Sequence, residues 1–164
     1  MRQLSTSLLV FVSFLGISQT ESDVVLISTT DFETVLKTAS NPCDKAALYY
    51  ENRKSNPDST LYYLDLAHKL AKDCEEDALK AKIALRLGQN LNRVGDYQSV
   101  EPYYLEALMG FIAVSDTERV AFTHKCIGVN NKKMFRYVDA LKAFNTSAYY
   151  YHLINDKEGI ATLD

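Results

Sequence analysis

The side chains that could carry chemistry in this chain are three histidines, three cysteines and one run of carboxylates. His68, His124 and His152 fall in different segments, and none has an acidic or second histidine partner at the spacing of metal ligands. We therefore expect no metal and no cofactor. The carboxylates at residues 75–77 are adjacent, which suits a solvated turn before a helix better than acid–base catalysis.

Two of the cysteines are placed to form a disulfide bond. Cys43 is expected to begin one helix and Cys74 to end the next, and those ends are adjacent in an antiparallel hairpin. In an oxidising compartment the bond would close a loop of about 30 residues and stabilise the fold by roughly 3–4 kcal/mol. The alternative is two unpaired small residues. Cys126 precedes Ile127 and is expected to be a buried small hydrophobic residue.

Composition argues against other kinds of site. The 6 glycines are scattered, so no loop is suited to cradling a phosphate. The net charge of −3 gives no bulk attraction to nucleic acid. We expect no enzyme within these residues. With only 6 Gly and 3 Pro in 164 residues, the chain favours helices over turn-rich β structure.

The segments that must position these residues repeat at an interval of about 40 residues. Gly88 matches Gly128, and Tyr104 matches Phe144 and, one interval earlier, Leu64. A repeat of this length indicates a stacked helical array. Helices are predicted at 31–39, 42–53, 58–73, 77–94, 97–113, 117–134 and 137–154, with another starting near Glu158.

An all-α fold follows, namely a right-handed α-solenoid of stacked antiparallel helix pairs, with about three repeats and the start of a fourth. Gly88 and Gly128 lack a Cβ, so the partner helix can approach closely there, and neighbouring pairs must stack to bury a shared apolar face. Gly95 suits the left-handed conformation that ends a helix. Phe135 holds the equivalent position, which predicts a different turn. The units span about 41–76, 77–116 and 117–156, with a partial unit at 157–164.

The N-terminus is predicted to be a secretory signal peptide covering residues 1–18. Arg2 supplies positive charge, and residues 8–17 form an unbroken apolar run followed by small residues. A membrane anchor is the alternative, but the run is shorter than the roughly 20 residues that a spanning helix needs. Residues 19–40 are a lead-in with a short capping helix. Export would place the protein in the periplasm or outside the cell.

The pattern of Leu87, Gly88, Tyr97, Tyr104 and Ala107 resembles the tetratricopeptide repeat (TPR). The stretch "LGQNLNRVGDYQSVEPYYLEAL" matches the core of that repeat well, "IGVNNKKMFRYVDALKAFNTSA" moderately, and residues 41–74 weakly. The period is longer than the common one, and the usual closing proline is absent. Long-period repeats behind a signal peptide are similar to the extracytoplasmic sensor regions of bacterial sensor histidine kinases.

The resemblance implies a concave groove lined by the first helix of each unit. Arginine and lysine there could bind carboxylates, and amides could bind an extended peptide backbone. The alternative is a solvated polar face, because Lys and Arg also favour helix C-termini. The expected groove residues are Lys45, Tyr49, Asn52, Arg53, Lys82, Leu85, Gln89, Asn92, Arg93, Lys125, Lys132 and Lys133.

The resulting functional expectation is a non-catalytic scaffold that binds a protein or peptide, acidic or with a free carboxylate. The alternative is the sensory region of a sensor histidine kinase, or of another signalling regulator, whose output domain follows residue 164. The chain would then meet a membrane only through that downstream segment.

Overall fold

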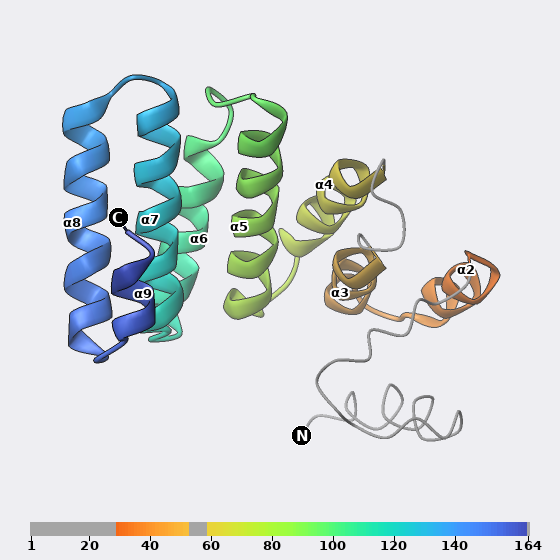
Figure 1. The fold of residues 1–164 in the computed structure, drawn as a ribbon. Helices are drawn as coiled ribbons and strands as arrows, with labels where there is room; N and C mark the ends of the chain where they lie inside the picture. The colour runs from red at the N-terminus through yellow and green to blue at the C-terminus, as the bar shows by residue number, and fades with distance from the viewer. Residues whose placement is uncertain (1–28, 53–58, 164) are drawn as a thin grey trace.

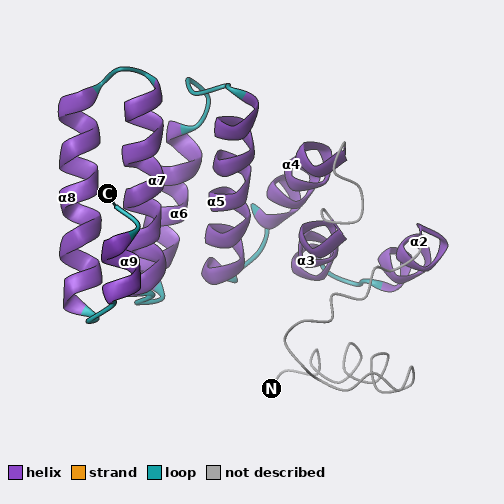
Figure 2. Ribbon diagram, viewed as in Figure 1, coloured by secondary structure: helices purple, strands orange, loops and turns teal. Residues whose placement is uncertain are grey.

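The computed structural model describes residues 29–52 and 59–163. All regular structure within these ranges is helical, which confirms the predicted all-α class (Figure 2). The predicted signal peptide and Arg53 lie outside the described residues. In chain order the helices of Figure 1 are α2 (Thr29–Thr38), α3 (Pro42–Asn52), α4 (Thr60–Ala71), α5 (Asp77–Val94), α6 (Glu101–Ala113), α7 (Thr117–Lys133), α8 (Tyr137–Leu153) and α9 (Lys157–Ala161).

Helices that follow one another in the chain pack against one another. The pairs α3–α4, α5–α6 and α7–α8 make the most extensive contacts, α4 packs on α5 and α6 packs on α7. The hairpins α5–α6 and α7–α8 turn at the same end of the molecule (Figure 1). None of the helices that the structure describes is long and apolar enough to cross a bilayer.

Glycines set the closest approaches within two hairpins. A Cβ added to Gly88 would lie 2.5 Å from Cε1 of Tyr104, and one added to Gly128 would lie 2.6 Å from Cε1 of Phe144. Any larger residue would therefore force the two helices apart or displace the ring. The two hairpins use the same contact at the positions that the sequence period equates. In the preceding hairpin the equivalent residue of the second helix, Leu64, is fully buried.

The turns between the last five helices share one backbone conformation. Each contains a residue with positive φ, about 20 residues after the previous one: Gly95 (88°), Ser115 (56°), Phe135 (60°) and Asn155 (55°). In the turn at Phe135, its amide donates to Lys132 O at 3.1 Å and the Arg136 amide donates to Asn131 O at 2.9 Å. This is the Schellman arrangement, and the other three turns repeat it. The prediction of a different turn at Phe135 is therefore wrong.

At two of these turns the aspartate after the left-handed residue caps the next helix. Oδ1 of Asp116 accepts a hydrogen bond from the Arg119 amide at 3.0 Å, and Oδ1 of Asp156 accepts one from the Gly159 amide at 2.8 Å. Asp96 likewise accepts from the Ser99 amide. In the α7–α8 turn the same position is Arg136, which caps nothing with its side chain.

Helix α6 starts at Glu101, four residues later than predicted. The Asp96 side chain holds the Ser99 amide at 3.3 Å in a local turn, which competes with helix formation. Pro102 then lies in the first helical turn, where a missing amide hydrogen costs nothing.

The N-terminal hairpin is covalently closed. A disulfide joins Cys43 at the start of α3 to Cys74 just after α4, across a sequence separation of 31. Helix α2 docks on this hairpin through Phe32, which is buried and lies 5.6 Å from the ring of Tyr49 and 6.1 Å from that of Tyr63.

Candidate functional site

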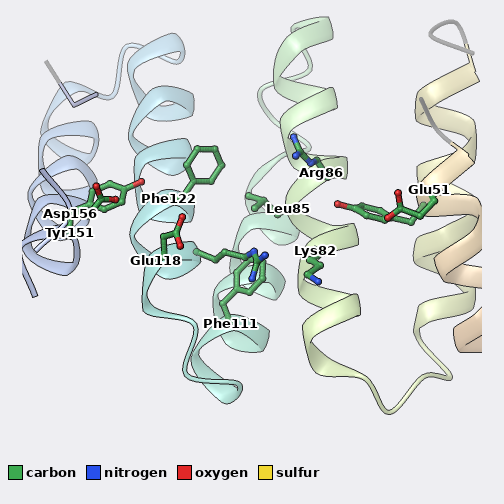
Figure 3. Close-up of a pocket in the computed structure, with 11 residues that line it drawn as sticks. Glu51, Lys82, Leu85, Arg86, Phe111, Glu118, Phe122, Tyr151 and Asp156 are labelled. Atoms are coloured by element: carbon green, nitrogen blue, oxygen red, sulfur yellow. The ribbon is translucent and has the colours of Figure 1, made fainter. Parts of the chain in front are cut away.

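One cavity has a volume of about 480 Å³ and lies between α5 and α7. Lys82, Leu85 and Arg86 of α5 face Glu118 and Phe122 of α7 across it (Figure 3). Residues from α3 to the turn after α8 complete its lining. The remaining lining residues are Tyr50 and Glu51 of α3, Phe111 of α6, Arg119 of α7, Tyr151 of α8 and Asp156 of the following turn.

A second cavity of about 240 Å³ continues along the same two helices. Phe122 lines both cavities, so the two are neighbours on one face. The other lining residues are Gln89, Asn92, Tyr104, Lys125, Cys126 and Val129. Together the two cavities form a trough over the first helices of units two and three, and we call it the groove.

Five of the residues predicted for the groove line it. Lys82 and Leu85 line the larger cavity, whereas Gln89, Asn92 and Lys125 line the smaller one. Leu85 is buried and forms part of the floor. Position within the repeat therefore predicted four of the α5 residues that line the cavities, although not Arg86.

The predicted residues of α3 lie elsewhere. Lys45, Tyr49 and Asn52 do not line either cavity. Tyr49 packs between Phe32 and Tyr63, and burial followed by the nearby Glu33 carboxylate raises the pKa of its phenol. The next two residues of α3, Tyr50 and Glu51, line the groove instead, so the expected register on this helix is shifted.

The predicted basic residues at the helix ends also lie outside the cavities. Arg93, Lys132 and Lys133 are exposed in the last turns of α5 and α7. Nη2 of Arg93 donates to Oδ1 of Asn90 at 3.0 Å. These cations belong to the end of the molecule where the α5–α6 and α7–α8 turns lie.

The amides of the smaller cavity already join helices to one another. Nδ2 of Asn92 donates to Oδ1 of Asn130 at 2.9 Å, and Nδ2 of Asn130 donates to the Tyr97 carbonyl at 3.2 Å. Nε2 of Gln89 approaches Sγ of Cys126 at 3.7 Å. Asn92 and Gln89 can make further hydrogen bonds to a ligand, but contacts with α7 and the α5–α6 turn fix the orientation of their amides.

The charged walls of the larger cavity have opposite signs. Lys82 and Arg86 supply positive charge from α5, one helical turn apart. Glu118 and Asp156 lie near Tyr151 on the opposite side. Burial raises the pKa of the Tyr151 phenol most, and the two carboxylates raise it further. Within residues 29–52 and 59–163, neither Lys82 nor Glu118 has an ion-pair partner. A ligand with both charges can therefore bridge the two walls.

Several charged lining residues are already engaged. Nη1 of Arg86 donates to Oε1 of Gln89 at 3.1 Å. Arg119 pairs with the Asp116 carboxylate, and its guanidinium carbon lies 5.7 Å from the centroid of the Phe111 ring. Asp156 caps α9 through Gly159.

Sequence reasoning missed Arg86, which the helical spacing from Lys82 could have revealed. It also missed Tyr151 and Asp156, whose approach to the groove follows from how the helices stack.

The groove offers no activated nucleophile. Burial raises the pKa of the Cys126 thiol, and burial likewise raises the pKa of the Tyr104 phenol beside it. Both groups are thus held neutral. In the part of the chain that the structure describes, no three His, Cys, Asp or Glu side chains are grouped to hold a metal ion. The groove presents charge, aromatic surface and amides to a ligand.

Comparison of the chain with protein-family models, curated proteins and solved structures finds no match.

Proposed function

We propose that this protein is a TPR-like scaffold that binds a peptide segment of a partner protein in the groove. The observation that carries the proposal is the pair of adjoining cavities along α5 and α7, with Phe122 between them. An extended peptide suits such a trough, since aromatic walls take its side chains and opposed charges fix its direction. The resemblance to TPR proteins, which commonly bind peptides on this surface, supports the same reading.

The proposal includes export to an oxidising compartment. The Cys43–Cys74 disulfide supports it, because structural disulfides persist mainly outside the cytosol. The apolar run at residues 8–17 supports it independently, as the core of a signal peptide.

The groove is tested by panning a random peptide display library against the full chain. Selected peptides are then measured by fluorescence anisotropy against Phe122→Ala and against the double variant Lys82→Ala/Arg86→Ala. We expect each to weaken binding by at least about tenfold, because each removes a wall of the larger cavity. Met109→Ser, on the exposed side of α6, is the matched control and should bind as the parent does.

Two results would overturn the proposal. One is enrichment of peptides that bind the groove variants as tightly as the parent. The other is the absence of any enriched peptide on the parent chain while circular dichroism shows it fully helical.

A further inference from the structure

The α7–α8 turn departs from its three counterparts at two consecutive positions. Phe135 adopts φ of 60° where the other turns have Gly, Ser and Asn. A left-handed conformation is costly for a bulky residue, because its Cβ approaches the following carbonyl oxygen, whereas glycine has no Cβ. Arg136 then stands where the others have an aspartate, two of which cap the next helix, and it lies next to the positive end of the α8 dipole. Local stability explains neither residue, and such departures concentrate at functional positions.

These residues belong to an exposed apolar tip, formed by Phe135, Tyr137, Val138 and Leu141. Their exposed fractions are 77 %, 61 %, 69 % and 62 %. The Phe135 and Tyr137 rings contact each other edge to face, with centroids 6.3 Å apart. None of the four lines either cavity of the groove. The α7–α8 turn, which carries these exposed side chains, lies at one end of the molecule (Figure 1).

A collar of positive charge surrounds the tip. It comprises Lys132, Lys133, Arg136 and Lys142, against the single carboxylate of Asp139, which lies 3.7 Å from Lys142. Among the described residues, Lys132, Lys133 and Arg136 have no ion-pair partner. The helix dipole accounts for lysines in the last turn of α7 but opposes Arg136 at the start of α8. Arg93 in the last turn of α5 and Asp96 in the α5–α6 turn lie at the same end and add one charge of each sign.

We infer that the α7–α8 tip binds the surface of an anionic lipid bilayer. Aromatic and aliphatic side chains enter the boundary between headgroups and acyl chains, while the surrounding cations meet lipid phosphates and carboxylates. An exposed apolar tip that lines neither cavity suits a deformable surface better than a folded protein, which needs a larger complementary face. This binding is separate from the groove, so a peptide and a membrane can be held at the same time.

The test measures partition of the full chain between buffer and vesicles. One vesicle set is phosphatidylcholine alone, and the other contains roughly 30 % phosphatidylglycerol, whose negative surface attracts cations. We expect stronger binding to the anionic vesicles, weakening as salt is added. The full chain keeps the apolar run at residues 8–17 constant in every sample, so only the dependence on anionic lipid reports on the tip.

The decisive variant is Phe135→Gly/Arg136→Asp, which gives this turn the residues of the α5–α6 turn. It should reduce the anionic-lipid-dependent partition coefficient by at least about tenfold, since each charge near the surface contributes about fivefold. Its thermal midpoint should be equal or higher, because glycine relieves the left-handed strain and aspartate caps α8. Loss of binding thus cannot come from unfolding. Met109→Ser, equally exposed on α6, is the control and should partition like the parent.

Equal partition of parent and double variant would overturn the inference, as would equal binding of the parent to neutral and anionic vesicles. A parent dimer in sedimentation velocity that the double variant abolishes, without anionic-lipid binding, would also overturn it in favour of a second copy at the tip.

Discussion

Gly88 and Gly128 make equivalent close contacts in the α5–α6 and α7–α8 hairpins. Each lies against a ring of the second helix, at distances that leave no room for a methyl group. Tyr104 is 2 % exposed, so an added Cβ at Gly88 would have to displace a buried ring. The close approach is thus a property of these two residue types together, glycine on one helix and an aromatic ring on the other.

Gly88→Ala should lower the free energy of unfolding by about 1–2 kcal/mol. Overpacking costs up to about 3 kcal/mol, and roughly 1 kcal/mol returns through the helix propensity of alanine. Gly128→Ala should cost a similar amount, because its contact is equivalent. Urea denaturation measures both, with Asn145→Ala on the exposed face of α8 as control. If Gly88→Ala stabilised the protein as Asn145→Ala is expected to do, the close contact between Gly88 and Tyr104 would be contradicted.

His124 gives the fold a dependence on pH. Its ring stacks on Tyr150 with centroids 5.7 Å apart, and burial lowers the pKa of the imidazole. The unfolded chain binds this proton at an ordinary pKa of about 6.5, so folding favours the neutral ring. The stabilisation is therefore fully present above about pH 6.5 and is lost as the pH falls from there toward the lower pKa of the folded state.

The comparison with His124→Gln isolates this contribution. The parent should lose more free energy of unfolding than the variant between about pH 7.5 and about pH 5, because only the parent takes up the extra proton on unfolding. His68 and His152 are present in both proteins, so their titration cancels in the difference. Parallel stability curves for the two proteins would show that folding does not perturb His124.

At the scale of helices, the turns show what local sequence could and could not predict. Hydrophobic periodicity and capping signals placed most helix boundaries within two residues, because they are local properties. The α6 start was misplaced, since a side chain to backbone bond from Asp96 held the chain in a turn first. The turn at Phe135 was mispredicted because its conformation is imposed by the packing of α7 on α8, against the preference of the residue.

The groove was predictable to the extent that it is repetitive. Lys82 and Leu85 were found because their place in the repeat fixes which face of α5 they occupy. On α3 the repeat signal is weak, and Tyr49 was chosen where Tyr50 lines the cavity. Tyr151 reaches the groove from a second helix, which depends on how successive hairpins are rotated. That rotation is a property of the stacked helices, so a single repeat sequence carries no signal for it.

At the scale of the whole molecule, packing runs almost entirely between neighbours in the chain. Such an array behaves nearly as a one-dimensional system, in which stability is a sum of units and their interfaces. The first hairpin holds α2 on one side and meets α5 on the other, and it is the only described unit closed by a disulfide. Its stability should therefore be adjustable without changing the distant hairpin α7–α8.

The double variant Cys43→Ser/Cys74→Ser tests this independence. Loss of the bond should lower the free energy of opening α2, α3 and α4 by about 3–4 kcal/mol in the chain-entropy model. Hydrogen exchange followed by mass spectrometry should show faster exchange in those helices and unchanged exchange in α7 and α8. Equally faster exchange throughout would mean that the array unfolds as one unit. Because Tyr50 and Glu51 line the larger cavity, the variant should also weaken peptide binding in the groove while leaving the α7–α8 tip intact.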